Sequence, residues 1–478
     1  MLRIWIAIAA VAAVAALSVL LGKRSARRLQ RERHIHVDQY KLKKRHADIE
    51  LEVFGSREVV TAIQTYARDH HVTTEAAMRQ AREYLREIVP KFNLLAYYRF
   101  GAPIARALMY FLYWVVVERK TILDFNERAA RGTTVFVINH RSNADYVLVA
   151  HMLFKFISLS YAVGEWARVW PLNHLFKWFG AYFIRRRYRE PLYHAVLSKF
   201  VQTITKNGVT QGIFIEGGLT RDGAFRMPKL GMLDYIVTSK RDPEFTAPLT
   251  IIPTSINYDR VLEDRHLTDE LHGREDRATK TQKLRTTFEF LFKNSLRSMF
   301  RRFKRYGYAV VAFGEPISVD DFIVQHPALL RTDFNERKPE LLRLVDAIMN
   351  EISRALPVTP VPLVARIFTD HGEDAVAEQR ILEDIQRYRT EWADRVWVLP
   401  EKSPAEIWAS AKEVLLLRHL ISVAPPTAAA MWRWDANDLL LRDFYANSLL
   451  TYAEVKSRGW PERAVMADEA PAAVRVAS

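Results

Sequence analysis

Between residues 133 and 316, short apolar runs alternate with longer helical stretches, and this alternation constrains the fold more than any other feature. The clearest runs are residues 135–138, 212–215, 249–256 and 308–313. Runs of this length and composition predict buried strands. Strands interleaved with helices indicate an α/β layer. We therefore expect an α/β fold with a mostly parallel central sheet flanked by helices, and ligands near the ends of the strands.

An apolar segment lies near the N-terminus, at residues 4–21, with Ser18 as its only polar member. It is just long enough to cross a bilayer core. A cleaved signal peptide is the alternative, but the run is long for one and its charges lie on the wrong side. Only Arg3 precedes the run, and the cations that follow it are Lys23, Arg24, Arg27, Arg28, Arg31 and Arg33. This arrangement predicts an uncleaved anchor at the inner (plasma) membrane, with the remaining chain in the cytoplasm and the cations near acidic headgroups.

Changes of pattern divide the chain into five predicted regions. These are a transmembrane anchor with its basic flank (1–33), a helical N-terminal region (34–120), an α/β domain (121–320), a helical C-terminal domain (321–460) and a disordered tail (461–478). Helices are expected at 341–356, 377–395, 404–420 and 439–455, with proline-rich breaks at 357–362 and 425–426.

Two further segments have a pattern of their own. The ten apolar residues 108–117 are too few to span a bilayer and predict a buried or interfacial helix. The pattern of residues 288–305 predicts a basic amphipathic helix, which would be either an ordinary surface helix or a membrane contact.

Charge and cysteine content narrow the classes of function. The chain has no cysteine, which excludes disulfides, cysteine-based zinc sites and a thiolate nucleophile. Its formal net charge of +15 implies an anionic partner. Nucleic acid, an anionic lipid surface and phosphorylated substrates all meet that requirement.

A block of polar residues follows the first predicted strand directly and contains His140 and Asp145. Histidine exchanges a proton near neutral pH. An aspartate five residues on can return across a turn to hold the second ring nitrogen. Such a pair, without a serine or cysteine partner, suggests a base that activates a hydroxyl of the substrate. A histidine that merely caps the next helix would give the same pattern, so this block alone leaves both interpretations open.

Three more blocks close or follow apolar runs. The second ends in Arg185, Arg186 and Arg187, whose planar guanidinium groups suit a phosphate, although a solvated basic edge would look alike. The third block, 214–223, combines an acid, two glycines and hydrogen-bond donors, which either approach a ligand or form an ordinary turn. The fourth, 251–260, contains Pro253, which suggests an end or edge position in a sheet.

In order and spacing, these four blocks resemble the glycerolipid acyltransferase family, and most of all its glycerol-3-phosphate acyltransferase branch. The resemblance covers roughly residues 95–455 and includes the segments 313–316 and 444–450. It implies that a fatty acyl group moves from acyl-CoA or acyl-(acyl carrier protein) to the sn-1 hydroxyl of glycerol 3-phosphate, the first step of phospholipid synthesis. His140 would be the general base and Asp145 would orient it. The hydroxyl oxygen would attack the thioester directly.

The same resemblance assigns the binding residues. Arg185 and Arg186 match the phosphate-binding pair of the family. The residues that match its acceptor-binding third block are Glu216, Gly217, Thr220 and Arg221. Pro253 lies in the block associated with the acyl donor. Positioning and base catalysis on an activated thioester require no metal and no cofactor beyond that co-substrate.

One position departs from the family pattern, because Leu219 stands where the third block usually has an arginine. Either Arg226 or Lys229 replaces that guanidinium, or the acceptor is lysophosphatidate or dihydroxyacetone phosphate. The length of the chain and its helical flanking regions favour glycerol 3-phosphate.

Three other classes of function are disfavoured. A serine hydrolase would be expected to carry G-x-S-x-G, which the sequence lacks. A metal site could use side chains in the charged N-terminal stretch, but no periodic pattern fixes their geometry there. Those side chains are His34, His36, Asp38, His46 and Asp48. A membrane-tethered nucleic-acid or scaffold protein would fit the charge but lacks a recognition motif. The expected partners are therefore membrane phospholipids, glycerol 3-phosphate and the acyl thioester, and not nucleic acid.

Overall fold

The computed structural model describes residues 46–89, 102–118, 131–153, 160–163, 182–185, 188–271, 304–372, 375–424 and 430–459. The predicted anchor at 1–33, Arg186, Arg187, nearly all of the predicted basic helix at 288–305 and the predicted tail lie outside these ranges. Among the helices that are described, none has both the length and the apolar character needed to cross a bilayer.

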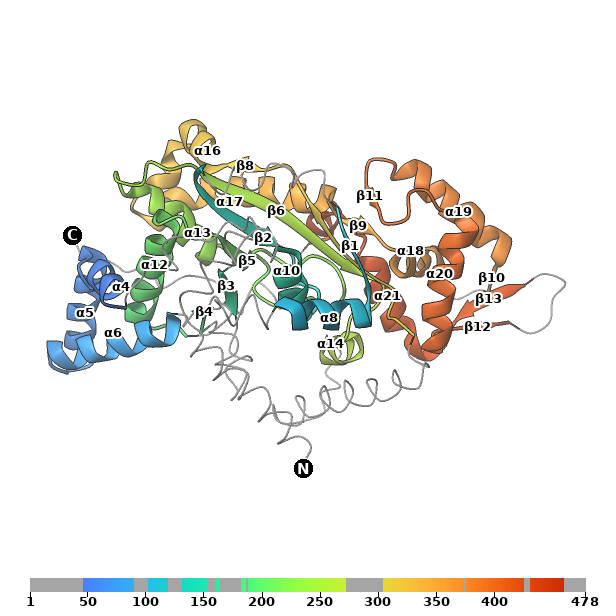
Figure 1. The fold of residues 1–478 in the computed structure, drawn as a ribbon, viewed down its shortest axis with the longest axis horizontal. Helices are drawn as coiled ribbons and strands as arrows, with labels where there is room; N and C mark the ends of the chain where they lie inside the picture. Colours follow the sequence, from blue (N-terminus) through green and yellow to red (C-terminus); the bar gives the residue numbers. More distant parts are fainter. Residues whose placement is uncertain are drawn as a thin grey trace, which may run out of the picture.

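A central sheet of eight strands runs through the molecule, in the order β1-β7-β6-β2-β5-β3-β4, with β8 paired to β6 (Figure 1). The strands are β1 (Trp114–Val117), β2 (Thr133–Ile138), β3 (Ser160–Val163), β4 (Tyr182–Phe183), β5 (Gln211–Phe214), β6 (Leu249–Tyr258), β7 (Tyr308–Phe313) and β8 (Ile317–Ser318). Only the pairings of β6 with β7 and with β8 are antiparallel among the described strands of this sheet. The predicted α/β fold with a mostly parallel sheet is confirmed, and β2, β5, β6 and β7 are the four predicted strands.

Helices flank the sheet and form both ends of the molecule. Those up to β8 are α4 (His46–Phe54), α5 (Arg57–Asp69), α6 (Thr74–Ile88), α8 (Ala102–Leu112), α10 (Asp145–Leu153), α12 (Pro191–Lys206), α13 (Gly231–Thr238) and α14 (Asp264–Leu271). Those after it are α16 (Val319–Gln325), α17 (Phe334–Arg354), α18 (Pro360–Asp370), α19 (Glu378–Glu391), α20 (Pro404–Leu417), α21 (Leu439–Asn447) and α22 (Tyr452–Ser457). Short 3₁₀ turns lie at Ser239–Arg241, Pro327–Leu330 and Ala436–Asp438.

The two faces of the sheet bury different apolar clusters, because successive side chains of a strand point to opposite faces. In β2, Phe136 and Ile138 join one cluster, whereas Val135 and Val137 join the other. The first cluster extends into α18, α20 and α21, and the second into α5, α6, α12, α13 and α17. Figure 1 shows the blue N-terminal helices at one end and the orange and red C-terminal helices at the other. The C-terminal helices therefore share a core with the sheet.

The apolar run at 108–117 is not a single helix, contrary to the prediction. Helix α8 ends at Leu112, and β1 begins at Trp114 and pairs in parallel with β7. The three valines of β1 explain the change, because β-branched side chains favour a pleated strand over a helix. A strand from before residue 121 thus joins the sheet. The predicted domain boundaries otherwise stay predictions.

The edge position suggested for Pro253 is also wrong. Pro253 lies inside β6, opposite Val137 of β2. On the other side of β6, β7 reaches Thr254 and β8 begins opposite Ile251, so Pro253 faces the junction of these two strands. Its carbonyl accepts the N–H of Gly314 at that junction, 2.9 Å away. The missing N–H of the proline falls where the ladder is already interrupted, and the sheet tolerates it.

The C-terminal region contains strands that the sequence analysis did not predict. Residues 357–362, predicted as a break, contain a short strand and the start of a helix. Strand β9 (Pro357–Val358) pairs with β11 (Val396–Trp397), and α18 starts at Pro360. Proline suits the first turn of a helix, where its missing N–H has no intrahelical partner to lose. A small antiparallel sheet joins β10 (Val376–Ala377), β13 (Met431–Trp434) and β12 (Ile421–Val423). The helix expected at 439–455 is divided into α21 and α22.

Candidate active site

The loop that carries His140 begins at the end of β2, where hydrogen bonds to β6 hold its first residue. β2 ends at Ile138, and the next residue, Asn139, is fully buried. Its side-chain Nδ2 donates to the carbonyl of Ile256 at 3.0 Å, and the N–H of Ile256 donates to Asn139 Oδ1 at 2.8 Å. This two-way bond to β6 fixes the backbone immediately before His140.

His140 and Asp145 form a buried pair. Nδ1 of His140 lies 2.9 Å from Oδ2 of Asp145, and their side chains are 2% and 0% exposed. The same oxygen accepts the N–H groups of Arg141 at 2.8 Å and Ser142 at 3.1 Å. Asp145 is also the first residue of α10, where a negative charge is favourable. The predicted contact is confirmed, and Asp145 rather than His140 accepts the N–H groups of this turn.

The ring of His140 is held on several sides. It stacks on Phe214 at the end of β5, with ring centroids 4.2 Å apart, and meets the edge of Tyr146 from α10 at 5.4 Å. The hydroxyl of Tyr146 lies 3.5 Å from Nε2. Donation from Nδ1 to Asp145 selects the tautomer whose Nε2 carries the lone pair. The geometry therefore suits Nε2 to accept a proton.

Two residues beyond the predicted set complete the surroundings of Asp145. The hydroxyl of Tyr258, in β6, donates to Oδ1 of Asp145 at 2.6 Å. Burial, followed by the charge of Asp145, holds the pKa of Tyr258 well above its usual value, so the phenol keeps its proton and remains a donor. The only sequence signal was the place of Tyr258 in the fourth block.

Glu263 is the second of these residues. Its carboxylate accepts the hydroxyl of Ser142 at 2.8 Å and the N–H of Asn143 at 3.3 Å. Burial is the main cause that raises the pKa of Glu263 to about 7, and Asp145 adds to it. Glu263 thus ties the middle of the turn between His140 and Asp145 to the chain beyond β6.

The third block wraps around the main chain of His140. Glu216 is fully buried, and its two oxygens accept the N–H groups of His140 at 3.3 Å and Arg226 at 3.2 Å. Burial raises the pKa of Glu216 to about 7, although Arg141 acts in the opposite direction. The N–H of Thr220 donates to the carbonyl of His140 at 3.3 Å. These residues form one compact unit around His140.

Leu219, the residue that departs from the family pattern, and the two cations proposed to compensate for it lie close to the residues around His140. Leu219 packs against the first apolar cluster, and Nη1 of Arg226 donates to the Leu219 carbonyl at 3.3 Å. Gly217 has φ +65°, and a β-carbon there would come within 2.8 Å of Cγ of Lys229. Both cations proposed to replace the missing arginine therefore lie beside the third block. Arg221 pairs with Glu270 of α14 at 2.6 Å.

Arg185 has a partner that the sequence analysis did not foresee. Its Nε and Nη2 donate to the two oxygens of Glu87 in α6, at 3.0 and 2.6 Å. Its guanidinium also lies over the rings of Tyr84, Tyr188 and Tyr193. Its planar face and two of its donors are thus used in joining α6 to the start of α12, whereas Arg186 lies outside the described residues.

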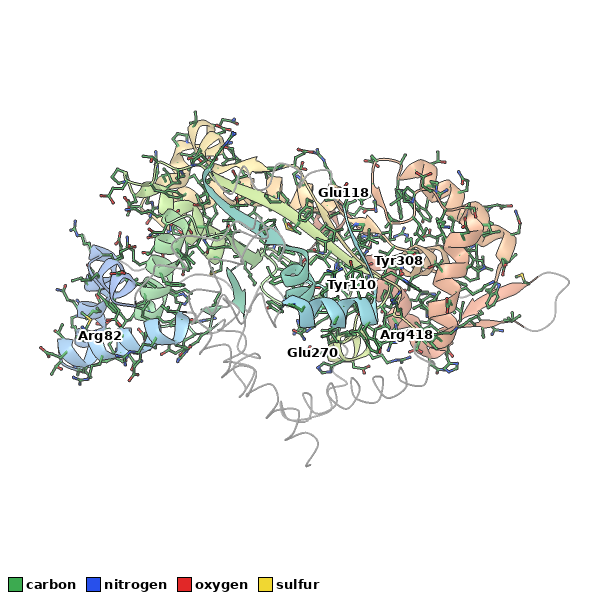
Figure 2. All side chains as sticks on the ribbon, in the orientation of Figure 1. Arg82, Tyr110, Glu118, Glu270, Tyr308 and Arg418 are labelled. Atoms are coloured by element: carbon green, nitrogen blue, oxygen red, sulfur yellow. The ribbon has the colours of Figure 1, made fainter. Side chains whose placement is uncertain are left out.

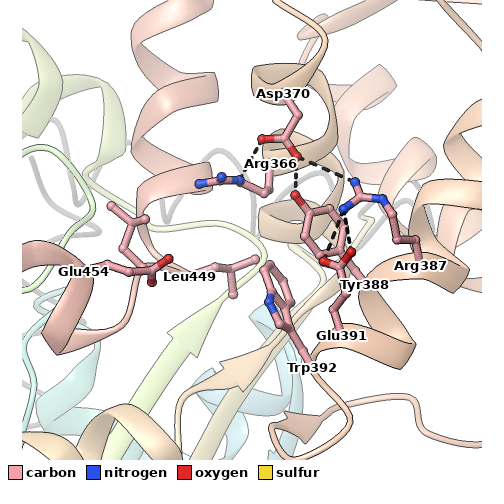
Figure 3. A pocket seen from close by; sticks show the side chains of 9 residues that line it. Arg366, Asp370, Arg387, Tyr388, Glu391, Trp392, Leu449 and Glu454 are labelled. Atoms are coloured by element: carbon pink, nitrogen blue, oxygen red, sulfur yellow. Dashed lines mark hydrogen bonds and ion pairs between the residues drawn. The ribbon is translucent and has the colours of Figure 1, made fainter.

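A polar cavity of about 360 Å³ lies among the C-terminal helices, away from the residues named above (Figure 3). Its charged side chains pair with one another, as Arg366 does with Asp370 at 2.9 Å and Arg387 with Glu391 at 3.1 Å. In the described part of the chain, no three His, Asp or Glu side chains gather into a candidate metal site.

Comparison with known families gives two matches along the chain. Residues 115–257, which carry most of the sheet and the His140 site, match the family model described as "Acyltransferase". Residues 293–454 match "Glycerol-3-phosphate acyltransferase C-terminal region". The segment that carries the His140 site thus matches an acyltransferase model, and the segment after it matches a region named for glycerol-3-phosphate acyltransferases.

Individual relatives agree with this reading. The glycerol-3-phosphate acyltransferase of Haemophilus influenzae (strain PittEE) is 24% identical over 414 residues, which are 82% of this chain and 48% of the relative. That of Xanthomonas campestris pv. campestris is 27% identical over 419 residues, 82% of this chain and 45% of the relative. The chain belongs to the glycerol-3-phosphate acyltransferase family. It spans about half the length of the curated relatives it matches.

Among solved structures, the 1-acyl-sn-glycerophosphate acyltransferase of Thermotoga maritima is similar to the chain at 18% identity and a TM-score of 0.30. The similarity covers 63% of this chain and 90% of that one.

Proposed function

We propose that this protein transfers a fatty acyl group from an acyl thioester to the sn-1 hydroxyl of glycerol 3-phosphate and forms 1-acylglycerol 3-phosphate. The observation that carries the proposal is the His140–Asp145 pair, in which Asp145 holds Nδ1 of His140 and so favours Nε2 as the proton acceptor. Family membership supports the choice of reaction, because the relatives named above are glycerol-3-phosphate acyltransferases.

In the proposed mechanism, Nε2 of His140 takes the proton of the sn-1 hydroxyl while its oxygen attacks the thioester carbonyl. The new C–O bond forms, the C–S bond breaks, and the departing sulfur takes the proton back from the imidazolium. Asp145 stabilises that imidazolium through Nδ1. Positioning and base catalysis suffice for this step. The side chain of His140 is 2% exposed, so bulk water competes poorly with the acceptor hydroxyl.

The phosphate of the acceptor is proposed to contact Arg186 and Arg226, with Arg221 close by. Arg185, held by Glu87, would fix the backbone next to Arg186 rather than bind the phosphate itself. Glu216, Gly217 and Thr220 would shape the loop that holds the acceptor. The block around Pro253 would serve the acyl donor, as in the family pattern.

The proposed setting is the cytoplasmic face of the inner (plasma) membrane, to which residues 1–33 would attach the protein and where membrane phospholipids are its neighbours. Acyl-CoA or acyl carrier protein would bring the acyl group. Neither a metal nor a separate cofactor is required by the chemistry proposed.

A direct assay tests the function. Purified protein is incubated with labelled glycerol 3-phosphate and a palmitoyl thioester, with lysophosphatidate and dihydroxyacetone phosphate as competing acceptors. The expected product is 1-acylglycerol 3-phosphate. Transfer to either competitor without transfer to glycerol 3-phosphate would reject the proposed acceptor. Stoichiometric labelling of one serine by a fluorophosphonate probe would reject direct transfer.

Arg226 is expected to matter for acceptor binding. Arg226→Ala should raise the KM for glycerol 3-phosphate about tenfold or more, because a hydrogen bond to a charged group contributes about 1.5–3 kcal/mol. A contact equally strong in the ground and transition states changes KM and leaves kcat. Arg189→Ala is the matched control, since Arg189 is an exposed arginine near the second block. Equal KM values for both variants would remove Arg226 from the phosphate site.

Tyr258 is expected to act through Asp145. Tyr258→Phe keeps the ring in β6 and removes only the hydroxyl that donates to Oδ1 of Asp145. We expect kcat to fall about tenfold, with both KM values nearly unchanged, because the lost bond leaves Asp145 free to turn away from His140. Steady-state kinetics with both substrates measure this. An unchanged kcat in a folded variant would show that Tyr258 has no positioning role.

A further inference from the structure

The C-terminal end of α21, residues Phe444 to Ser448, touches the third block although more than two hundred residues separate them in sequence. Nδ2 of Asn447 donates to the carbonyl of Asp222 at 3.0 Å. The next residue, Gly223, has φ +85°, and a β-carbon there would come within 1.7 Å of the Phe444 carbonyl oxygen. Only glycine permits this close approach of the two backbones. Both segments therefore carry a residue that this contact requires, Gly223 in the third block and Asn447 in α21.

The same end of α21 reaches the His140 loop through Arg141. Arg141 is 1% exposed and follows His140 directly. Its Nη1 donates to the carbonyl of Gly223, and its Nη2 to the carbonyl of Ser448 at 3.4 Å. A buried cation is costly unless hydrogen bonds satisfy it. One guanidinium thus joins three segments: the His140 loop, the third block and the end of α21.

Tyr445, also in α21, holds the segment that follows β6, residues 261–264. Its hydroxyl donates to Oδ2 of Asp264 and accepts the N–H of Val261 at 3.1 Å. Arg418 completes the cluster with an ion pair to Asp264 at 2.6 Å. Figure 2 labels Arg418 in the region where α14 packs against α21. Glu263, which accepts hydrogen bonds from Ser142 and Asn143 in the turn between His140 and Asp145, lies next to Asp264 in the sequence.

We propose that Phe444–Ser448 is a positioning element for the active site, with Asn447 and Tyr445 as its two positioning residues. Asn447 fixes the third block, which holds the acceptor. Tyr445 fixes residues 261–264 and, through Glu263, the turn beside His140. The inference rests on the proposed function and deepens it: acceptor affinity and turnover depend on the C-terminal region of the chain.

The first test uses the full chain with Asn447→Asp, which keeps the shape of the side chain and replaces its donor by an oxygen facing the Asp222 carbonyl. We expect the KM for glycerol 3-phosphate to rise about tenfold and the KM for the thioester to stay within twofold. Amide hydrogen exchange at residues 216–226 should become faster. The matched control is Asn207→Asp, because Nδ2 of Asn207 likewise donates to a main-chain carbonyl, that of Thr203, at 2.8 Å.

Tyr445→Phe is the second variant. It tests the contact of Tyr445 with residues 261–264, and it keeps the proposal testable if Asn447→Asp does not fold. It should speed hydrogen exchange at residues 141–145 and 261–264 and lower kcat about fivefold, with the KM for glycerol 3-phosphate unchanged within twofold. Exchange that rises evenly over the whole chain, or variants that match the wild type, would overturn the proposal.

Hydrogen exchange needs no substrate and separates the two claims. A wild-type protein without transferase activity, combined with faster local exchange in Asn447→Asp, would reject the proposed function and retain the positioning contacts. An active wild-type protein with unchanged kinetics and exchange in both variants would reject the positioning role alone.

Discussion

Replacing His140 by alanine is expected to lower kcat about a thousandfold, while both KM values change only slightly. The imidazole is the proposed base, and a positioned general base typically contributes about 10²- to 10⁴-fold to the rate. The effect falls on kcat because proton transfer occurs in the transition state rather than in substrate binding. Incorporation of labelled glycerol 3-phosphate into lipid measures the loss.

His70→Ala is the control for this experiment. His70 is an exposed histidine at the end of α5, with 46% of its side chain accessible, and it takes no part in the proposed site. Its replacement should leave turnover near the wild-type value. More than a tenth of the wild-type kcat in the His140 variant would refute the assignment of the base, provided that hydrogen exchange shows both variants to be folded.

The sequence predicted the centre of the fold because its signals there are local. The apolar, β-branched residues of β2 mark a strand buried on both faces, and the polar residues after Ile138 mark where it ends. The spacing of His140 and Asp145 allows their contact, because five residues suffice to form the turn into α10, and the family resemblance implied it. Each of these sequence patterns spans a single strand or turn, so it can be recognised without knowledge of the rest of the fold.

The residues that the sequence did not reveal act over long separations. Tyr258 reaches Asp145 across 113 residues, and Glu263 reaches Ser142 across 121. No short pattern links such pairs. Arg185 illustrates the converse: three adjacent arginines suggest a phosphate site, but the carboxylate that binds Arg185 comes from Glu87, 98 residues earlier.

Two errors came from general rules that the tertiary structure overrode. Proline is usually confined to sheet edges because it lacks an N–H, yet Pro253 lies inside β6, at the point where the pairing with β7 ends and the pairing with β8 begins. The run at 108–117 has helical composition in its first half and valines in its second, and the parallel pairing with β7 decides that the valines form a strand. Both outcomes depend on a neighbouring strand distant in sequence.

Asp145→Asn is expected to lower kcat about a hundredfold or more, and the reason lies in the number of donors that Asp145 accepts. Oδ2 receives His140 Nδ1 and two backbone N–H groups, and Oδ1 receives the Tyr258 hydroxyl. An asparagine has only one oxygen. If its amide nitrogen faces His140, Nδ1 must become the acceptor and the proton moves to Nε2, which can no longer act as a base. If it faces Tyr258, it leaves that phenol without its acceptor.

The first orientation should give the larger loss, because it inverts the tautomer, whereas the second should resemble Tyr258→Phe. Comparing kcat of the two variants therefore identifies which orientation the amide takes. Asp333→Asn is a suitable control: Asp333 is the N-cap of α17 and accepts two backbone N–H groups, a role that asparagine fills equally well. It should match the wild type. Wild-type turnover in Asp145→Asn would mean that the bond between residue 145 and the histidine ring does not set the protonation of His140 during catalysis.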